Sequence, residues 1–356
     1  MSARGRLVTT PEELTESWAS AVFGAEIREV RREQVGTGQI GTCFRLHLDA
    51  MDDSGSRVPA SVLVKLPAAD PGTRELVAGT YRGEIRFYAE LAPTVAIRVP
   101  ACHLAVSTDS GAEFTLVMAD LAPAEQGDQI AGCDRARAED AVVNLAGLHG
   151  PRWCDPALLD IDGLTLSGPD DAAMLAELYG PTNELFLDGI GHLLDDDTAA
   201  TLRDVVPHIE AWTLARAERF GLVHGDYRLD NLLFPPDVGQ GYPGGVVAVD
   251  WQTLSLGLPG RDLAYLLGTS LDVELRREHE RALVAAYHQA LLGFGVTDYS
   301  FDDCWDDYRF AMLQGPLVAI FGCAYGTRTA RGDAMFAAMV TRACAAIRDL
   351  GSLALV

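Results

Sequence analysis

The sequence predicts an α+β protein with two lobes: a small N-terminal lobe built on an antiparallel sheet, and a larger, mainly helical C-terminal lobe. Its 356 residues exceed what one hydrophobic core usually organises. Apolar, β-branched runs dominate the first third of the chain, whereas helical periodicity dominates the rest. The segment Ala119-Asp120-Leu121-Ala122-Pro123 breaks the strand pattern. We therefore place the boundary between residues 1–119 and 120–356.

The composition describes a globular protein whose surface repels nucleic acid. Hydrophobic residues make up 48% of the chain, and 51 acidic against 28 basic residues give a net charge of −23. Such a surface repels phosphate backbones. No apolar run reaches the roughly 18–20 residues that cross a bilayer, and the N-terminus lacks the apolar core of a signal peptide. We expect a cytoplasmic protein without nucleic-acid or membrane partners; the oligomeric state stays open.

Residues 1–119 are predicted to form a five-stranded antiparallel sheet with accompanying helix. A capping box at residues 10–13 precedes a short helix whose apolar face carries Leu14, Trp18 and Val22. The first strand leads into a glycine-rich turn, and residues 52–55 supply the next turn. The other four strands are expected at residues 43–48, 60–66, 95–106 and 114–118.

The glycine turn has the pattern G-x-G-x-x-G, formed by Gly36, Gly38 and Gly41. In a dinucleotide-binding unit these glycines would follow a strand and open a helix. Here another strand follows, and Lys65 lies on the strand after that. A kinase glycine-rich loop has this order: backbone amides cover the phosphates, and a strand lysine reaches the α- and β-phosphates.

Lys65 is the only lysine among the 28 basic residues, the other 27 being arginine. Average usage would give on the order of twenty lysines in a chain of this length. A sequence that drifts toward arginine should keep lysine only where a compact ammonium is needed and a planar guanidinium does not serve. The alternative is that this single lysine survives by accident.

Residues 80–91 are predicted to form a helix in which a carboxylate lies on the apolar face. Glu84 shares that face with Tyr81 and Ile85. An unpaired buried carboxylate is costly, so Glu84 needs a cationic partner, and Lys65 is the natural candidate. Glu75 and Glu90 lie outside the apolar face. A partly exposed Glu84 without this role is the alternative.

The C-terminal lobe is predicted to be mostly helical. A helix from residue 136 ends at His149, which we interpret as a group that caps the helix C-terminus. A long helix is expected over residues 198–220. Three more helices are expected over residues 271–292, 302–325 and 331–350.

A polar loop lies between two apolar runs in the stretch L-V-H-G-D-Y-R-L-D-N-L-L-F. Its polar residues are His224, Asp226, Arg228, Asp230 and Asn231. Asp226 and Asn231 stand five residues apart, which is the spacing in the kinase catalytic loop, where the aspartate takes the hydroxyl proton and the asparagine binds Mg²⁺. We expect two short strands flanking a polar hairpin. An acidic surface turn is the alternative.

Asp250 follows a predicted strand over residues 246–249, 24 residues after Asp226. An aspartate at this position matches the D-F-G aspartate that chelates Mg²⁺. A strand-end aspartate that caps a turn is the alternative. Asp262 starts the next helix, either as its cap or as a tie to the catalytic loop. No A-P-E sequence or long activation segment follows Asp250, so a peptide substrate is not expected.

The motifs V-H-G-D-Y-R-L-D-N-L-L-F and V-D-W-Q resemble those of the aminoglycoside phosphotransferase and choline kinase superfamily. E-I-R-F-Y-A-E-L-A-P and D-L-A-P-A-E-Q-G-D-Q resemble the bacterial ecdysteroid-kinase-like branch. The resemblance implies a bilobal kinase-like fold and the phosphorylation of a small-molecule hydroxyl with ATP or GTP and Mg²⁺.

The resemblance also implies a role for each matching residue. Asp226 would be the catalytic base, and Asn231 and Asp250 would bind Mg²⁺. Arg228 would neutralise the γ-phosphate, and the crossover after Met118 would carry the adenine. The nucleotide-positioning set would comprise Lys65, Glu84, Gly36, Gly38 and Gly41. Trp251-Gln252 replaces the Phe-Gly of the protein-kinase motif.

Two other functions stay open. The first is a kinase-like protein that binds nucleotide without catalysis, although every catalytic position is filled. The second is a hydrolase that uses His224 near Asp226, although no G-x-S-x-G or reactive cysteine accompanies it. Among kinases, the sequence does not decide between an aminoglycoside and a choline- or steroid-like acceptor.

Overall fold

The computed structural model describes residues 6–36, 41–51, 58–236 and 245–356. The chain divides into two compact units. The first unit comprises Met1–Thr94, Val99–Pro123 and Asp250–Thr253, and the second comprises Val95–Arg98, Ala124–Val249 and Leu254–Val356. The short segment that begins with Asp250 therefore belongs to the first unit, although the chain on both sides of it belongs to the second.

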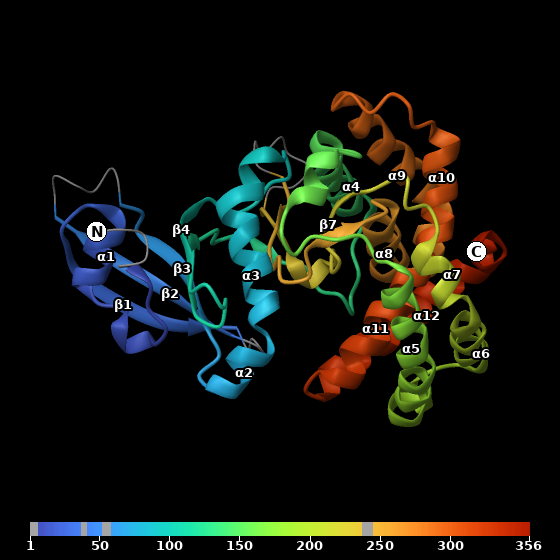
Figure 1. The fold of residues 1–356 in the computed structure, drawn as a ribbon, viewed down its shortest axis with the longest axis horizontal. Coiled ribbons are helices and arrows are strands. Elements are labelled where there is room, and N and C mark those ends of the chain that lie inside the picture. Colours follow the sequence, from blue (N-terminus) through green and yellow to red (C-terminus); the bar gives the residue numbers. More distant parts are fainter. Residues whose placement is uncertain (1–5, 37–40, 52–57, 237–244) are drawn as a thin grey trace. The chain divides into compact units, whose positions relative to one another are not determined.

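The first unit contains the five-stranded antiparallel sheet that the sequence predicts (Figure 1). Its strands lie in the order β1-β2-β3-β5-β4, and all neighbours are antiparallel. The bounds are β1 Ile27–Val35, β2 Gly41–Ala50, β3 Ser61–Pro67, β4 Cys102–Ser107 and β5 Phe114–Ala119. The predicted turn at residues 52–55 lies outside the described residues.

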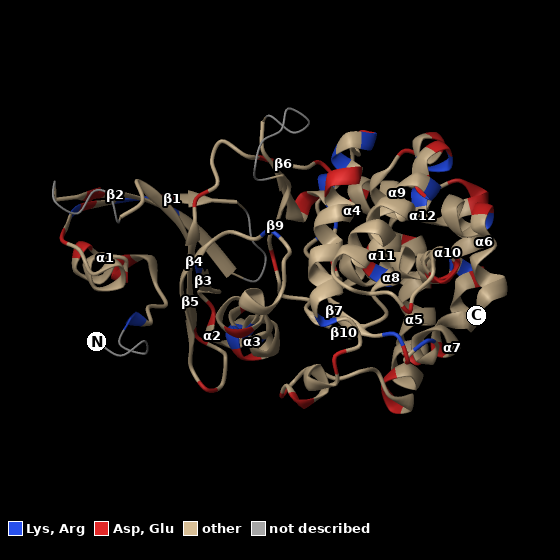
Figure 2. Cartoon of the chain, turned by 90° about the horizontal axis from the view of Figure 1, so that it is seen from above, with Lys and Arg blue, Asp and Glu red and all other residues tan. Residues whose placement is uncertain are grey.

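Side-chain alternation along β3 determines where Lys65 points. Val62, Val64 and Leu66 are fully buried and belong to a core that also contains Trp18 of helix α1 (Glu16–Phe23). Because successive strand residues face opposite sides of a sheet, Lys65 faces away from this core. Helix α3 (Ala78–Arg86) covers that other side (Figures 1 and 2).

The helices of the first unit largely follow the sequence pattern. The capping box of residues 10–13 is present, but it closes a 3-10 turn at Pro11–Glu13. Helix α1 begins after it, with Thr15 as the N-cap accepting from the Trp18 backbone N–H. After the short α2 (Pro71–Leu76), α3 continues as a π-helical turn, Phe87–Leu91. The predicted face of residues 80–91, including Glu84, is buried.

The second unit is mainly helical, as predicted. Helix α8 lies at its centre and is buried along almost its whole length. Acidic residues and arginines are interspersed along many of the surrounding helices (Figure 2). The helices are α4 Arg135–His149, α5 Pro169–Ile190, α6 Asp196–Val205, α7 Ile209–Leu214, α8 Gly260–Ser270, α9 Val273–Gly293, α10 Phe301–Phe310, α11 Gln314–Tyr325 and α12 Ala330–Leu350. Among the described residues, no helix is both long enough and apolar enough to span a bilayer.

Two of the long helices predicted for this unit are each divided in the structure. The helix expected over residues 198–220 splits into α6 and α7 around a 3-10 turn that contains Pro207, a residue without the N–H that a continuous helix needs. A second 3-10 turn, Ala311–Leu313, separates α10 from α11.

The polar loop at residues 224–231 is not a hairpin, contrary to the prediction. It joins β7 (Gly221–Val223) to β8 (Leu232–Phe234), and these two strands pair with other partners. β7 pairs with β10 (Ser255–Gly257), whereas β8 lies between β6 (Glu125–Gln126) and β9 (Val247–Ala248). The loop therefore links two small sheets, and its conformation depends on contacts with surrounding elements.

Candidate active site

The first unit places Lys65 against two carboxylates from distant parts of the chain. Its Nζ lies 2.7 Å from Glu84 Oε2 and 3.5 Å from Asp250 Oδ1. Lys65 comes from β3 and Glu84 from α3, whereas Asp250 comes from the segment that returns to this unit 185 residues after the lysine. The three residues that the sequence assigned to nucleotide and metal thus form one ionic cluster.

Burial and neighbouring charges shift the pKa values of Lys65 and Glu84 in opposite directions. Burial alone lowers the pKa of Lys65, but the carboxylates of Glu84 and Asp250 outweigh it and raise that pKa to about 12. Burial raises the pKa of the Glu84 carboxyl, which is only 2% exposed, and the ammonium opposes that shift. Lys65 is therefore a fixed positive charge at physiological pH.

The backbone of Asp250 and the ring of Trp251 direct the carboxylate. Asp250 has a φ of +68°, in the left-handed region that non-glycine residues rarely occupy. Trp251 is fully buried and stacks on Phe87, with ring centroids 3.5 Å apart and ring planes 7° from parallel. This stacking holds the segment beside the end of α3, the helix that carries Glu84, so packing compensates for the unfavourable backbone.

Gln252 is a member of the cluster that the sequence did not single out. With both ends of its amide satisfied, its nitrogen donates to Asp250 Oδ1 at 3.2 Å and its oxygen accepts from Lys65 Nζ at 2.8 Å. The side chain thus links the lysine to the aspartate. The sequence showed only that this glutamine replaces the glycine of the protein-kinase motif.

The described part of the glycine turn fits a backbone that approaches another group closely. Gly36 follows β1 with a φ of +73°, and a Cβ on Gly41 would lie 2.9 Å from the Leu66 carbonyl oxygen. Both positions therefore favour glycine. Gly38 lies outside the described residues. Met118, assigned to the nucleotide site, lies near the end of β5, pairs with Leu63 in the sheet and is 7% exposed.

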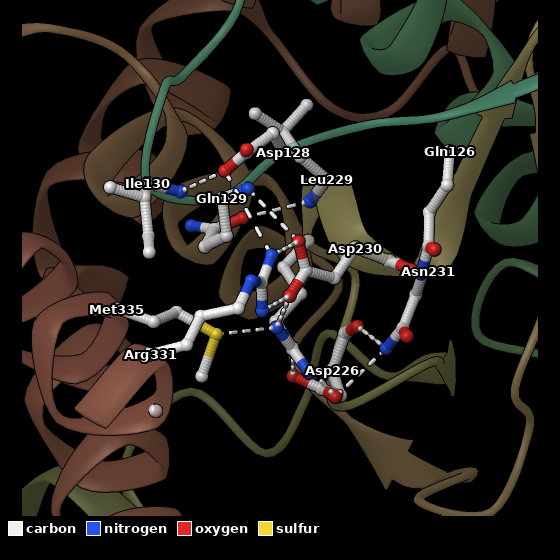
Figure 3. A network of polar contacts seen from close by, with 12 residues as sticks. Gln126, Asp128, Gln129, Ile130, Asp226, Leu229, Asp230, Asn231, Arg331 and Met335 are labelled. Carbon is white, nitrogen blue, oxygen red and sulfur yellow. Dashed lines mark hydrogen bonds and ion pairs between the residues drawn. The ribbon is translucent and has the colours of Figure 1, made fainter. Parts of the chain in front are cut away.

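In the second unit, three side chains among the described residues donate to the Asp226 carboxylate. Asn231 Nδ2 donates to Oδ2 at 2.8 Å, and Tyr265 Oη donates to Oδ1 at 2.8 Å. Arg228 Nε is shared between Oδ1 and Oδ2 at 3.0 and 3.1 Å. The predicted base is therefore held in one orientation, and Figure 3 shows its contact with Asn231.

Arg228 connects Asp226 to a second carboxylate. Its Nη1 lies 2.9 Å from Asp230 Oδ2, and the same nitrogen donates to the sulfur of Met335. Arg331, from the first turn of α12, also contacts this carboxylate: its Nη1 lies 3.4 Å from Asp230 Oδ2 (Figure 3). Burial lowers the pKa of Arg228, but the carboxylates of Asp226 and Asp230 outweigh burial and raise it. Arg228 is thus a charged group, and its guanidinium contacts loop carboxylates.

Asn231 presents its amide oxygen for another role. Both of its hydrogen bonds to Asp226 are made by Nδ2, which donates to the backbone carbonyl at 2.9 Å and to the carboxylate. The backbone carbonyl of Asn231 accepts from the Val249 N–H at 3.0 Å, so the residue that precedes Asp250 is bonded to the loop.

Helix α8 and His149 hold the start of the loop. Asp262 Oδ2 and Oδ1 accept from the backbone N–H groups of His224 and Gly225 at 2.6 and 2.9 Å, so Asp262 ties the loop rather than capping its own helix. The interpretation of His149 as a helix cap is wrong. Its buried ring contacts Tyr287 Oη at 2.7 Å and Asp262 Oδ2 at 3.3 Å, because α4 ends where α8 and α9 meet it.

The side chain of His224 contacts the backbone of the loop and of the segment before Asp250. Its Nδ1 accepts from the Asp226 backbone N–H at 3.3 Å, and its Nε2 lies 3.1 Å from the Val249 carbonyl. Since a carbonyl can only accept, Nε2 is the donor in this contact. Both ring nitrogens thus contact the backbone, which argues against the alternative of a hydrolase that uses His224.

Gln129 is a second residue that the sequence did not identify. Its fully buried amide accepts from the Leu229 N–H at 2.9 Å, and its own backbone N–H donates to Asp230 Oδ1 at 2.9 Å (Figure 3). It ends the motif D-L-A-P-A-E-Q-G-D-Q, but the motif does not indicate its partner, because Gln129 lies 100 residues before the loop that it supports.

Comparison with known proteins gives a match to part of the chain. Residues 197–294, which include the loop and Asp250, match the model of the ecdysteroid kinase-like family. A stretch of 53 residues is 49% identical to mouse (Mus musculus) acyl-CoA dehydrogenase family member 10; it covers 15% of this chain and only 4% of that protein.

Solved structures match almost the whole chain. A Ralstonia eutropha JMP134 protein, provisionally named an aminoglycoside phosphotransferase, aligns with a TM-score of 0.57 and 19% identity, covering 96% of this chain and 99% of that one. Choline kinase from Cryptosporidium parvum Iowa II aligns with a TM-score of 0.57 and 10% identity, covering 92% and 91%. The predicted resemblance and the bilobal kinase-like fold are confirmed.

Proposed function

We propose that this chain transfers the γ-phosphoryl group of ATP or GTP to a hydroxyl group of a small molecule. The observation that carries the proposal is the ionic cluster in which the single lysine of the chain contacts both Glu84 and Asp250. Phosphoryl transfer depends mainly on positioning and on neutralising charge, and a lysine held by a glutamate is the group that kinases use for nucleotide phosphates. The same fold is found in a choline kinase.

In this proposal, the first unit holds the nucleotide. Lys65 contacts the α- and β-phosphates, and Glu84 fixes the direction of its side chain. The backbone at Gly36, Gly38 and Gly41 covers the phosphates, where side chains would block a close approach. Met118 borders the adenine.

Asn231 and Asp250 have the chemistry that Mg²⁺ requires. Mg²⁺ takes oxygen ligands, and in nucleotide sites it uses one or two protein oxygens together with phosphates and water. The Asp250 carboxylate and the Asn231 amide oxygen supply such ligands, since Asn231 uses its nitrogen for Asp226. When bound, the ion would supply positive charge that neutralises the charge developing during transfer.

Asp226 acts as the base. The acceptor oxygen forms a bond to the γ-phosphorus, the bond from that phosphorus to the β-γ bridging oxygen breaks, and the hydroxyl proton passes to the Asp226 carboxylate. Arg228, a charged neighbour of Asp226, neutralises the γ-phosphate. The acceptor in this proposal is a small molecule, without a nucleic-acid or membrane partner. The proposed location is the cytoplasm.

Incubation of the purified chain with a metabolite extract tests the function. The chain is mixed with Mg²⁺ and ATP, or with Mg²⁺ and GTP, and mass spectrometry searches for a compound that gains one phosphate. We expect such a product with one of the nucleotides and its loss when a chelator removes the metal. A nucleotide-dependent rise in melting temperature without any phosphorylated product would contradict the proposal and favour a nucleotide-binding protein without catalysis.

A further inference from the structure

One face of helix α8 contacts the polar loop directly at two places and, through Gln129, at a third. Asp262 accepts from the backbone at His224 and Gly225, and Tyr265 donates to Asp226. One turn later, Thr269 accepts from the Gln129 amide, which in turn holds the Leu229 backbone. The three α8 positions are spaced at i, i+3 and i+7, which places them on one side of a helix.

The middle contact differs from the other two because it reaches a side chain of the proposed reaction. Tyr265 is 1% exposed, and its hydroxyl lies 2.8 Å from Asp226 Oδ1. Burial, together with the Asp226 carboxylate, raises the pKa of Tyr265 well above its usual range. The phenol therefore stays protonated and is a permanent hydrogen-bond donor. A buried tyrosine held by packing presents its hydroxyl with little freedom to move.

The other two donors to Asp226 belong to the loop itself and have other roles in the proposed reaction. Arg228 is assigned to the γ-phosphate, and Asn231 is assigned to the metal. Among the described residues, Tyr265 is the donor that comes from outside the loop.

We propose that Tyr265 is a positioning residue that fixes the orientation of the Asp226 carboxylate toward the acceptor hydroxyl. The inference rests on the proposed function, in which Asp226 is the base. A base acts efficiently only when its oxygen is within hydrogen-bonding reach of the proton that it removes, and small misplacements cost large factors in rate. Helix α8 thus aligns the loop backbone through Asp262 and the base through Tyr265.

Tyr265→Phe tests this inference, with Tyr308→Phe as the matched control. Tyr308 is also fully buried in the second unit, and its hydroxyl donates to a carboxylate, Glu280 Oε2, at 2.8 Å. Both variants therefore lose a buried hydroxyl–carboxylate hydrogen bond, but only Tyr265→Phe affects the loop. With Mg²⁺ and ATP as the probe and water as the acceptor, ADP release gives kcat and KM for each variant.

We expect Tyr265→Phe to lower kcat about 10- to 100-fold, the range for a hydrogen bond to a charged group. Its KM for ATP should stay within about twofold of wild type, and its melting temperature should match that of Tyr308→Phe. If both variants turn over, and do so with equal kcat values, Tyr265 has only a packing role and the inference is wrong.

A crystal structure of Tyr265→Phe separates this inference from the proposed function. We expect the Asp226 carboxylate to rotate away from its wild-type direction or to occupy two orientations; a single unchanged orientation would overturn the inference. If the wild-type chain phosphorylates no compound with either ATP or GTP while the carboxylate still reorients in Tyr265→Phe, the positioning role stands and the proposed function fails.

Discussion

Lys65 is the residue on which the nucleotide half of the proposal depends. Its ammonium contacts Glu84 at 2.7 Å, Asp250 at 3.5 Å and the Gln252 amide oxygen at 2.8 Å. These acceptors belong to three different residues around a compact charge. A planar guanidinium has fixed donor directions and a longer reach, so it would not reproduce the same contacts.

We therefore expect Lys65→Arg to raise the nucleotide KM or to lower kcat, although it preserves the positive charge. Steady-state kinetics with varied nucleotide measures the effect. Arg277→Lys, a conservative exchange at a partly exposed ion pair, is the control and should leave both constants unchanged. Wild-type constants in Lys65→Arg would show that the single lysine has no special role.

Among the elements, helix α8 makes the contact that most directly shapes the loop. Asp262 is fully buried and accepts two backbone N–H groups with its two oxygens. In Asp262→Asn, one oxygen becomes an NH₂ group, which can only donate and would face a backbone donor. Leaving one buried donor without an acceptor costs about 1–3 kcal/mol.

We expect Asp262→Asn to lower the free energy of unfolding by about this amount and to reduce turnover more than nucleotide affinity. Urea denaturation and nucleotide titration of the same preparation measure the two effects. Unfolding at wild-type urea concentrations would show that this contact does not hold the loop.

Asp120 directly follows β5 and couples the three inner strands of the first-unit sheet, β2, β3 and β5. Arg45 Nε lies 2.7 Å from its carboxylate and Ser61 Oγ lies 2.8 Å from it. Burial alone raises the pKa of Asp120, but these donors and the Ala122 N–H outweigh it and hold the pKa below its usual range. The unfolded chain thus binds a proton at higher pH than the folded chain does.

The contribution of Asp120 to stability is therefore present above the ordinary carboxyl pKa of about 4 and is lost as the pH falls through the lowered value in the folded chain. We expect Asp120→Asn to be less stable than wild type at pH 7, with a smaller difference near pH 3. Urea unfolding at both pH values checks this. A difference of equal size at the two pH values would contradict the assignment.

At the scale of the whole molecule, the sequence predicted the sheet, the helical unit and the order of the kinase-like motifs. These features are local, because strand alternation, the glycine turn and the spacing of Asp226 and Asn231 are visible within a few residues. Pro207 could also have indicated a break, but helical periodicity on both sides of it led to the prediction of one continuous helix.

Contacts between distant segments could not be predicted in the same way. Tyr265 lies in the apolar run L-A-Y-L-L, so its pattern indicated core packing and gave no sign of its hydroxyl contact with Asp226, 39 residues away. Gln129 and Gln252 end the motifs D-L-A-P-A-E-Q-G-D-Q and V-D-W-Q, but these motifs do not show which distant groups the two amides contact. His149 was assigned to its own helix end because the approach of Asp262 and Tyr287 depends on tertiary structure.

The residues proposed for the reaction are divided between the two units. Lys65, Glu84 and Asp250 belong to the first unit, and Asp226 and Asn231 belong to the second. We propose that both sets act in one phosphoryl transfer, in which Asp226 removes the proton of the acceptor and the other residues serve the nucleotide and its metal ion. Removing the base should therefore separate binding from chemistry.

Single-turnover transfer of labelled γ-phosphate by Asp226→Ala, with the nucleotide Kd measured on the same sample, tests this claim most directly. We predict a rate about 10²- to 10⁴-fold below wild type, the usual contribution of a general base, with the Kd unchanged. Transfer at the wild-type rate in Asp226→Ala would contradict the account.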